Sequence, residues 1–475
     1  MIVTRFPPEP NSILHLGHLK AMKFDFTYHP DSICYLRLDD TNPEAEKKEY
    51  VDSIIEDVEW LNFNIYKITH TSDYFDRLYD YAIELIKKDK AYVDFTSPIK
   101  MKEEREQGIC NEYRSKPIEW NLNEFKKMKS GVYQEGECML RLKIDMTSDI
   151  GSLRDPIAYR IKHVPHINVG EKWCIYPSYD YSHSIVDSLE GTTHSYCSVE
   201  FLDRRDLYYW TLKELGLREP NVTEFGRLNV EGGVLSKRKI LDMVNRGVVD
   251  GFDDPRLFTI RALRRRGFTP TMLHKLLEYV NMDRNDSTIS ADLISHCLRN
   301  ELAKTAKRFF AVIDPIECNV EGIKTEECKH PDLPSTDSAH LTTVSSHIYL
   351  ERSDFRPVDD SNYYRLAPGK TIRLKYSDFV EYVSHTDNEI NCKITVPTNP
   401  KKVKGIVHWL SRNDCVPAIF ELYDGMNKEV KSGFVEPDAV KHDGSMQFER
   451  LGYFKLDRIN DNGTPIFIRV VELKS

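Results

Sequence analysis

The feature that most constrains the fold is an alternation of strand and helix patterns that starts at the N-terminus, breaks off and later resumes. Residues 2–3 open an apolar strand, 14–26 have the character of a helix, and 33–38 form a second apolar strand. The segment 51–58 then carries Val and Ile at the i, i+3, i+4, i+7 spacing of an amphipathic helix. This order predicts a parallel α/β sheet of the Rossmann-like kind.

The break in the alternation predicts an inserted domain. Between about residues 90 and 170 the sequence is irregular and polar, and alternation returns at 173. An insertion between the halves of a nucleotide-binding fold lies over the ligand crevice at the carboxyl ends of the strands. Later, helical periods give way to short β-branched and aromatic runs separated by Asp, Asn, Gly and Pro, which predict antiparallel β-barrels. The predicted division is a Rossmann-like domain in two halves (1–90 and 173–235), an insertion (91–172), a helical connective subdomain (236–312) and two β-barrels (313–475).

Composition narrows the class of protein. Of the 475 residues 40% are hydrophobic and 30% charged, and no apolar run reaches eighteen residues. The N-terminus lacks the charged and apolar regions of a signal peptide, so we expect a cytoplasmic protein without a membrane partner. The formal net charge of −9 argues against a generic nucleic-acid coat, and a nucleic acid would need local basic patches. One such patch is predicted at Arg261, Arg264, Arg265 and Arg266, because four arginines on a short helix repel unless an anion is near.

The ten cysteines are scattered, with no CxxC pair and no histidine cluster near them. We therefore expect reduced thiols and no structural metal.

The first candidate motif follows the first strand, where the Pro-rich segment 6–11 leads into His15-Leu16-Gly17-His18. Two histidines three residues apart lie on one helix face near its positive N-terminus, where phosphate binds well. Gly17 has no Cβ, so a flat base can approach the backbone. Alone, the motif is also typical of core histidines.

The second candidate motif is the glycine-led segment 232–239, in which Leu235, Ser236 and Lys237 precede a helix. A lysine there can stabilise the negative charge that builds on a triphosphate, and the paired glycines let the loop move. Alone, this motif is also typical of a solvated basic helix start.

In this order, flanking an interrupted Rossmann pattern, the two motifs resemble the HIGH and KMSKS signatures of class I aminoacyl-tRNA synthetases. Further segments look like the glutaminyl-tRNA synthetases, in the glutamyl/glutaminyl subfamily, and the likeness covers essentially the whole chain. These segments are residues 5–11, 38–43, 172–177, 253–256, 263–268 and 447–454.

The resemblance implies a glutamine–tRNA ligase whose insertion grips the acceptor stem and whose barrels bind the anticodon. Its partners would be ATP as Mg-ATP, glutamine and tRNA(Gln). A glutamine carboxylate attacks the α-phosphate of ATP, and the 2′-hydroxyl of the terminal adenosine takes the aminoacyl group. The resemblance assigns catalysis to His15, His18 and Lys237. It assigns ATP binding to Glu9, Pro10, Asn11, His15, Leu16, Gly17, His18, Leu19, Lys20, Ala21, Ser198, Arg227, Leu228, Leu235, Ser236 and Lys237.

The resemblance places the amino acid against Arg5, Asp39, Tyr179, His183 and Cys197. Asp39 ends a strand at the expected ligand edge, where a carboxylate can hold an ammonium group. Without the family match, helix capping by Asp39 and core packing by Tyr179 would explain these residues as well.

Two positions bear on glutamine against glutamate. Cys197 stands where glutamate enzymes have arginine, and a buried glutamate side chain needs a paired cation, so Cys197 favours glutamine. Val222 stands where glutamine is usual in this family, and a valine cannot hold a water over the carboxamide. A glutamate–tRNA ligase therefore stays open as an alternative, as does a catalytically silent tRNA-binding paralogue.

For tRNA, the resemblance implies Asp203 at the acceptor stem and Arg352, Arg373, Gln447 and Arg450 at the anticodon. It also implies a monomer, which could associate with other synthetases. Since the chain starts close to its first strand, we expect no N-terminal tRNA-binding appendage.

Overall fold

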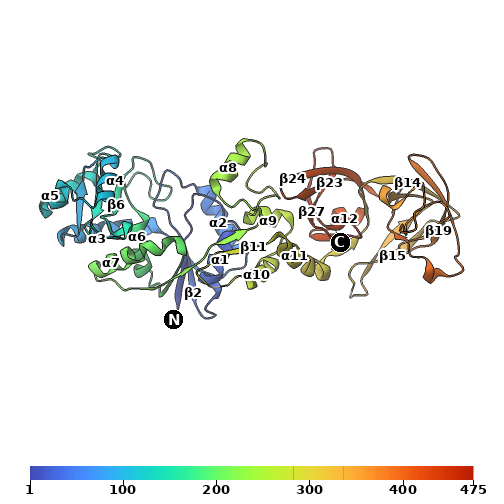
Figure 1. The fold of residues 1–475 in the computed structure, drawn as a ribbon, viewed down its shortest axis with the longest axis horizontal. Coiled ribbons are helices and arrows are strands. Elements are labelled where there is room, and N and C mark those ends of the chain that lie inside the picture. The colour runs from blue at the N-terminus through green and yellow to red at the C-terminus, as the bar shows by residue number, and fades with distance from the viewer. Residues whose placement is uncertain (282, 335, 474–475) are drawn as a thin grey trace. The chain divides into compact units, whose positions relative to one another are not determined.

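The structure is a computed structural model that describes residues 1–281, 283–334 and 336–473. The chain folds into two compact units (Figure 1). The first comprises Met1–Asp242 and Leu277–Ile289, and the second comprises Met243–Leu276 and Ser290–Ser475.

A parallel sheet forms the base of the first unit. Strands β1 (Val3–Phe6), β2 (Ile33–Leu38) and β3 (Ile65–His70) pair in parallel, as do β8 (His194–Ser198) and β9 (Asn221–Phe225). The backbone N–H of Thr193 donates to the carbonyl of Val3 (2.8 Å), so β8 begins beside β1. The connecting helices are α1 (Leu16–Met22), α2 (Lys48–Trp60), α6 (Tyr179–Leu189) and α7 (Arg205–Leu215). The prediction of a Rossmann-like parallel sheet is confirmed.

The first of these helices is shorter than the predicted segment 14–26. His15 is the N-cap of α1, and after Met22 the chain continues as a π-helical turn, Lys23–Thr27.

The inserted region folds around an antiparallel sheet of β4 (Ala91–Asp94), β5 (Met139–Leu142), β6 (Ile157–Ile161) and β7 (Ile175–Pro177). Helices α4 (Pro98–Gln107) and α5 (Ile118–Lys129) belong to the same region, and α3 (Phe75–Lys87), which precedes it in the sequence, packs against α5. Tyr79 of α3 and Phe125 of α5 stack in its core at 4.9 Å. Strand β7 lies after residue 173 and pairs with β6, so the sheet of the inserted region continues past the predicted boundary at 172/173. The exact domain boundaries stay a prediction.

The first unit is completed by a late segment of the chain. Strand β10 (Leu228–Val230) pairs in parallel with β11 (Ser287–Ile289), far along the sequence. Helix α8 (Lys237–Asn245) follows the second candidate motif.

In the second unit, helices α9 (Ile260–Arg266) and α11 (Ala291–Thr305) precede the strands, and α10 (Pro270–Glu278) begins in this unit and ends in the late segment of the first. Two members of the predicted arginine patch contact barrel strands of the same unit. Arg265 forms a paired contact with Asp457 (both 2.8 Å), and Arg266 donates to the carbonyl of Val470 (3.3 Å). Burial lowers the pKa of Arg266 to about 10. Both side chains therefore have partners on the barrel strands, and the contact of this patch with tRNA stays a prediction.

Two curved seven-stranded sheets form the barrels of the second unit. One has the order β12-β25-β26-β27-β23-β24-β13 and the other β21-β18-β19-β20-β14-β17-β22. Most pairs are antiparallel, and Figure 1 shows β23, β24 and β27 curving round one rounded body. The first sheet comprises β12 (Lys307–Phe309), β13 (Ala311–Val312), β23 (Val416–Asp424), β24 (Asn427–Val435), β25 (Ser445–Phe448), β26 (Gly452–Ile459) and β27 (Pro465–Val471). The second comprises β14 (Pro315–Glu321), β17 (His347–Glu351), β18 (Thr371–Leu374), β19 (Phe379–His385), β20 (Glu389–Ile394), β21 (Ile406–Val407) and β22 (Leu410–Ser411).

A separate hairpin, β15 (Glu326–Pro331) and β16 (Ala339–Val344), belongs to the same unit, and helix α12 (Pro437–Lys441) follows β24. The predicted C-terminal β-barrels are confirmed.

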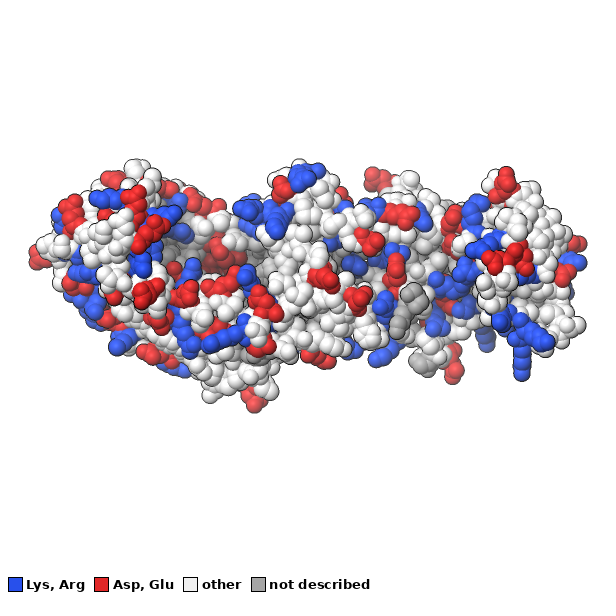
Figure 2. Space-filling model, in the orientation of Figure 1, with Lys and Arg blue, Asp and Glu red and all other residues white. Residues whose placement is uncertain are grey.

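The surface mixes charges of both signs. On the face drawn in Figure 2, acidic and basic side chains are interspersed rather than gathered into one basic surface. This distribution agrees with the net charge of −9. Among the described residues, every helix is too short or too polar to span a bilayer.

Candidate active site

A cavity of about 1030 Å³ opens in the first unit beside the ends of β1, β2 and β8. Its walls come from segments that lie far apart in the sequence, because parallel strands bring their carboxyl ends to one edge of a sheet. Most of the predicted site residues meet here. They are Arg5, Glu9, His15, Gly17, His18, Ala21, Asp39, Tyr179, Cys197, Ser198, Arg227, Leu228, Leu235 and Ser236.

The two imidazoles at the start of α1 are held by backbone donors. The N–H of Gly17 donates to Nδ1 of His15 and the N–H of His15 to Nδ1 of His18, each at 3.1 Å. Both rings are neutral, since burial lowers the pKa of His15 to about 4 and that of His18 well below its ordinary value. In a neutral ring whose Nδ1 accepts, Nε2 carries the hydrogen. Each imidazole can therefore donate a hydrogen bond to a phosphate oxygen without carrying charge.

Position 17 has to be glycine because the His15 ring and the backbone of β10 lie close to its Cα. A Cβ there would lie 2.9 Å from Cε1 of His15 and 3.2 Å from the carbonyl oxygen of Leu228. Any side chain would displace the His15 ring or β10.

The lining of this cavity, taken over the described residues, does not include six of the predicted ATP-binding residues. They are Pro10, Asn11, Leu16, Leu19, Lys20 and Lys237. Leu16 and Leu19 are buried in the core under α1. Lys20 is buried as well, 3.4 Å from Ser287 Oγ and 6.0 Å from the centre of the Phe225 ring. In this structure all three side chains contribute to the packing under α1.

Lys237, the predicted catalytic lysine, donates from Nζ to the carbonyl oxygen of Asn11. Its ammonium group also lies 5.2 Å from the centre of the Tyr50 ring, and burial lowers its pKa. Lys239, two residues later, does line the cavity. In this conformation the motif presents Ser236 and Lys239 to the cavity, and Lys237 bridges to the Pro-rich loop.

A small side pocket of about 40 Å³ adjoins Tyr179 and Cys197, which also line the main cavity. His183 and Val222 line the side pocket with them. The residues predicted to distinguish glutamine from glutamate therefore line one pocket. Tyr179 and His183, one turn apart on α6, stack with ring centres 4.6 Å apart.

Behind this pocket, Arg5 belongs to a buried ionic network. Its Nε donates to Asp187 (3.0 Å), and its other nitrogens contact the Tyr196 carbonyl (2.9 Å) and His183 Nε2 (2.7 Å). Arg37 also donates to Asp187 (2.5 Å). Although burial acts to raise the pKa of Asp187, the two guanidinium groups hold it far below its usual range. Arg5 is thus already neutralised by a carboxylate.

The other arginines of the side pocket are paired too. Arg204 lies 3.1 Å from Asp180 and Arg205 lies 3.5 Å from Glu224. Among the described residues that line this pocket, each cation therefore has a carboxylate partner, and a neutral side chain suits the pocket better than an anionic one.

Asp39 directly follows β2 at the cavity edge and is almost fully buried. Burial raises its pKa to about 7, with Arg37 acting in the opposite direction and Asp40 and Glu9 adding to the rise. Thr71 Oγ1 donates to it at 3.2 Å. A substrate ammonium group would compensate this carboxylate.

The predicted tRNA-binding residues differ in how they are engaged. In the first unit Asp203 is exposed, and its backbone carbonyl accepts from Ser152. In the second unit Arg352 and Arg373 are exposed and bond mainly to backbone carbonyls. Gln447 accepts from Arg308 (3.1 Å).

Arg450 is committed to a different partner. It forms a paired contact with the buried Asp354 (2.6 and 2.7 Å) and lies 3.1 Å from His408 Nδ1. To contact a base, it would have to leave this carboxylate.

Two functional features were missed in the sequence. Asp187 follows Tyr179 and His183 at four-residue steps, and this one-face spacing on α6 is a signal that was present. Gly226 was missed because its role depends on a loop sixty residues away: a Cβ there would lie 1.9 Å from the carbonyl oxygen of Asn285.

Comparison with known proteins gives matches over almost the whole chain. The family described as tRNA synthetases class I (E and Q), catalytic domain, matches residues 1–304. Two anti-codon binding domains of the same class match residues 306–398 and 406–457.

Individual relatives are similar to this chain over its whole length. The glutamine–tRNA ligase of Lupinus luteus is 42% identical over 100% of this chain and 65% of its own length. That of Clostridium perfringens is 39% identical over 100% of this chain and 94% of its own length. The chain thus spans just under two thirds of the plant protein. Among solved structures, a glutamate tRNA ligase from Elizabethkingia meningosepticum aligns with a TM-score of 0.47 at 18% identity, covering 63% of this chain and 69% of that one.

Proposed function

The chain belongs to the class I tRNA synthetases (E and Q), and from this membership we propose that it is a glutamine–tRNA ligase. In the proposed reaction a glutamine carboxylate oxygen attacks the α-phosphorus of ATP, the bond to the β-phosphate breaks and pyrophosphate leaves. The 2′-hydroxyl of the terminal adenosine of tRNA(Gln) then attacks the adenylate carbonyl, and AMP leaves. The protein contributes positioning and charge stabilisation, and no side chain acts as a nucleophile.

The choice of glutamine depends on the side pocket. Its arginines are paired with carboxylates, Arg5 is held by Asp187, and Cys197 and Val222 complete the wall. A glutamate carboxylate would enter without a free cation, which is costly in a buried site, whereas a carboxamide carries no charge. The curated relatives from Lupinus luteus and Clostridium perfringens are glutamine–tRNA ligases, which supports the same choice.

We assign the nucleotide to the main cavity. His15 and His18 would donate from Nε2 to phosphate oxygens, and Gly17 would let the base approach the backbone. Lys237 would exchange the Asn11 carbonyl for the triphosphate as negative charge builds there, a role that Ser236 and the neighbouring glycines assist.

We assign the amino acid to the adjoining residues. Asp39 would accept the ammonium group, and Tyr179 and His183 would contact the side chain. Arg5 would act through the shape of the pocket, because Asp187 already takes its charge.

The remaining assignments follow the family. The ATP would arrive with Mg²⁺, and the protein would work in the cytoplasm as a monomer that can join other synthetases. The insertion, with Asp203, would face the acceptor stem. In the barrels, the better candidates for reading anticodon bases are Arg352, Arg373 and Gln447. Arg450 is a weaker candidate because its guanidinium group is paired with Asp354.

The direct test is aminoacylation of unfractionated tRNA with labelled glutamine and, in parallel, labelled glutamate. We expect charging with glutamine alone. Charging with glutamate would mean that Val222 outweighs Cys197, and absence of charging with every tRNA would favour a silent tRNA-binding paralogue.

A substitution sharpens this test. Cys197→Arg would place an unpaired cation in the side pocket, and we expect it to lower kcat/KM for glutamine by at least about 100-fold, since an unpaired buried charge costs several kcal/mol. Cys197→Ser, which keeps the size and adds no charge, is the matched control. If both variants lost activity equally, the charge argument would be wrong.

A further inference from the structure

A hairpin in the second unit brings two histidines to the same point. His330 on β15 and His340 on β16 are directly opposite partners in the antiparallel register, and such partners project from the same face. Their ring centres lie 4.6 Å apart. His330 is fully buried and the side chain of His340 is 9% exposed.

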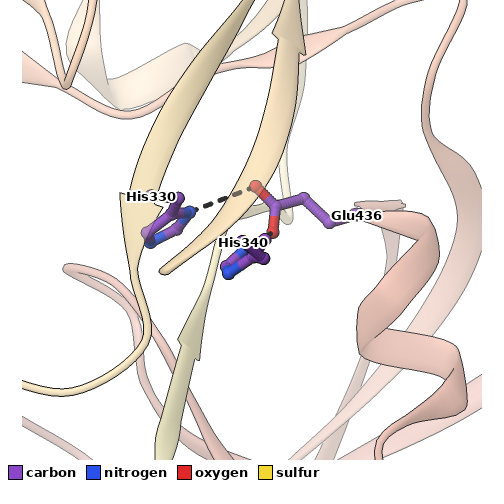
Figure 3. Close-up of side chains that lie close together, drawn as sticks. All are labelled: His330, His340 and Glu436. Atoms are coloured by element: carbon purple, nitrogen blue, oxygen red, sulfur yellow. Dashed lines mark hydrogen bonds and ion pairs between the residues drawn. The ribbon is translucent and has the colours of Figure 1, made fainter. Parts of the chain in front are cut away.

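A carboxylate from another element reaches both rings (Figure 3). Glu436 is the N-cap residue of α12, yet its side chain makes no capping bond to that helix. Its Oε1 lies 3.3 Å from Nδ1 of His330, and its Oε2 lies 2.9 Å from Nε2 of His340. The Glu436 carboxylate thus accepts no hydrogen bond from the N–H groups of α12 and contacts the two imidazoles instead.

We propose that His330, His340 and Glu436 form a binding site for a divalent transition-metal ion, with Zn²⁺ as the preferred ion. Their ligand atoms all lie within 4.8 Å of one another. Bonds from zinc to nitrogen and oxygen are about 2 Å long, so donor atoms arranged tetrahedrally around one ion lie roughly 3.3 Å apart. The distances from Glu436 to the two imidazole nitrogens, 3.3 and 2.9 Å, are close to that separation. Two imidazoles and one carboxylate are a donor set that zinc accepts, with a water as the fourth ligand.

The outer nitrogens of both rings support this assignment. His330 Nε2 lies 3.0 Å from Glu449, and His340 Nδ1 lies 2.8 Å from Asp332. A metal-bound histidine typically gives its other N–H to a carboxylate, which fixes the tautomer and orients the ring. The cluster contains that arrangement twice.

The number of N–H groups on the two imidazoles also favours a bound cation. A neutral imidazole has one N–H and one lone pair. If each ring donates outward to Glu449 or Asp332, its inner lone pair faces an oxygen of Glu436. Two such repulsive contacts are relieved together by one cation between the three side chains. The rival explanation is that both rings are protonated and hold Glu436 as imidazolium ions.

The outer carboxylates have partners of their own. Glu449 pairs with Lys375 and accepts from Tyr376 (2.8 Å), and Asp332 pairs with Lys307 (3.1 Å). Their charge is therefore balanced without the ion. The ion would compensate Glu436, and it would join the β15–β16 hairpin to the barrel segment that leads into α12.

The test uses the full-length protein and measures metal directly. The protein is stripped with a chelator, titrated with Zn²⁺ alone, and analysed for bound zinc after gel filtration. Titration with Co²⁺ reports the geometry through its visible ligand-field absorption. We expect one tightly bound ion per chain, tetrahedral cobalt absorption, and a melting temperature that rises with zinc.

Variants separate this site from adventitious binding. His340→Gln and Glu436→Gln should weaken zinc binding by at least about 100-fold, more than the loss of an outer carboxylate would. Asp332→Asn should weaken it by about 10-fold or more while the three ligands stay in place. His347→Gln, an exposed histidine on β17, is the matched control and should bind zinc like the unaltered protein.

Absence of stoichiometric zinc in the unaltered protein would overturn the proposal in favour of the imidazolium network. So would zinc binding that His340→Gln and Glu436→Gln leave unchanged. Neither readout depends on aminoacylation, so the result is independent of the proposed function.

Discussion

Asp39, the residue after a buried strand, carries a carboxyl group whose pKa burial raises to about 7. Below that pH the free protein holds a proton that an incoming ammonium group must displace. We expect KM for the amino acid to rise about tenfold per pH unit below pH 7 and to level off above it. His15 and His18 do not contribute, because burial keeps both imidazoles neutral over this range. Steady-state KM against pH checks this expectation.

The substitution Asp39→Asn tests which group titrates. It should raise KM for glutamine and abolish the pH dependence near 7. Since the folded pKa of Asp39 lies above its unfolded value, the wild-type carboxylate costs stability that grows as the pH rises from about 4 to 7. Denaturant unfolding of the ligand-free proteins should therefore show that Asp39→Asn raises the free energy of unfolding, relative to the unaltered protein, by more at pH 8 than at pH 5. A retained acid limb in the variant would assign the titration to another group.

Lys237 and Lys239 offer a second comparison at single residues. Lys237→Met should lower kcat by about 100-fold or more, as for loss of one charge-stabilising donor. Lys239→Met should lower it far less, although Lys239 lines the cavity and Lys237 contacts Asn11. Single-turnover adenylate formation with tRNA present measures the step itself. The reverse ranking would transfer the catalytic role to Lys239.

At the scale of elements, the turn between β9 and β10 packs against the loop before β11. A Cβ on Gly226 would lie 1.9 Å from the Asn285 carbonyl oxygen and 2.7 Å from the Asp286 nitrogen, both backbone atoms. Gly226→Ala should therefore destabilise the first unit by about 1–3 kcal/mol, the usual cost of overpacking. It should also raise KM for ATP, because Arg227 and Leu228 line the cavity.

Gly151→Ala is the matched control for this change. A Cβ at Gly151 meets no atom within 4 Å, so urea unfolding and ATP kinetics should stay at their unaltered values. If Gly226→Ala behaved in the same way, the close packing of the two loops would not matter for the site.

The same elements show what the sequence could predict. Apolar periodicity located β2 at residues 33–38 as observed, because a buried parallel strand is a continuous apolar run. Motif spacing brought His15, Gly17 and His18 together, since all three lie within one helical turn. The close approach at Gly226 and the burial of Arg266 could not be predicted, because each depends on a segment distant in the sequence. The pairing of His330 with His340 likewise follows from hairpin register, which the spacing alone does not fix.

At the scale of the whole molecule, an ion pair between Arg450 and Asp354 joins the two barrels, although the sequence predicts Arg450 at the anticodon. Arg450 holds Asp354, which is fully buried and also pairs with Arg365 (2.8 Å). Arg450→Met should lower the free energy of unfolding by about 3 kcal/mol, the lower end for a broken buried pair, because Arg365 remains. Arg373→Met should leave unfolding unchanged and raise KM for tRNA. Urea titrations and tRNA kinetics on both variants check this, and an unchanged stability for Arg450→Met would return that residue to base recognition.

The division of the chain limits how this protein can be dissected. The segment Leu277–Ile289 belongs to the first unit, but both of its ends continue into the second. It supplies β11, the partner of β10, and the loop that packs on Gly226. A fragment ending at Asp242 would leave β10 with an open edge and Lys20 without Ser287. Exchange of barrels between relatives, by recombination or by engineering, would therefore have to keep this strand with the nucleotide-binding unit, so a single crossover point cannot separate the two.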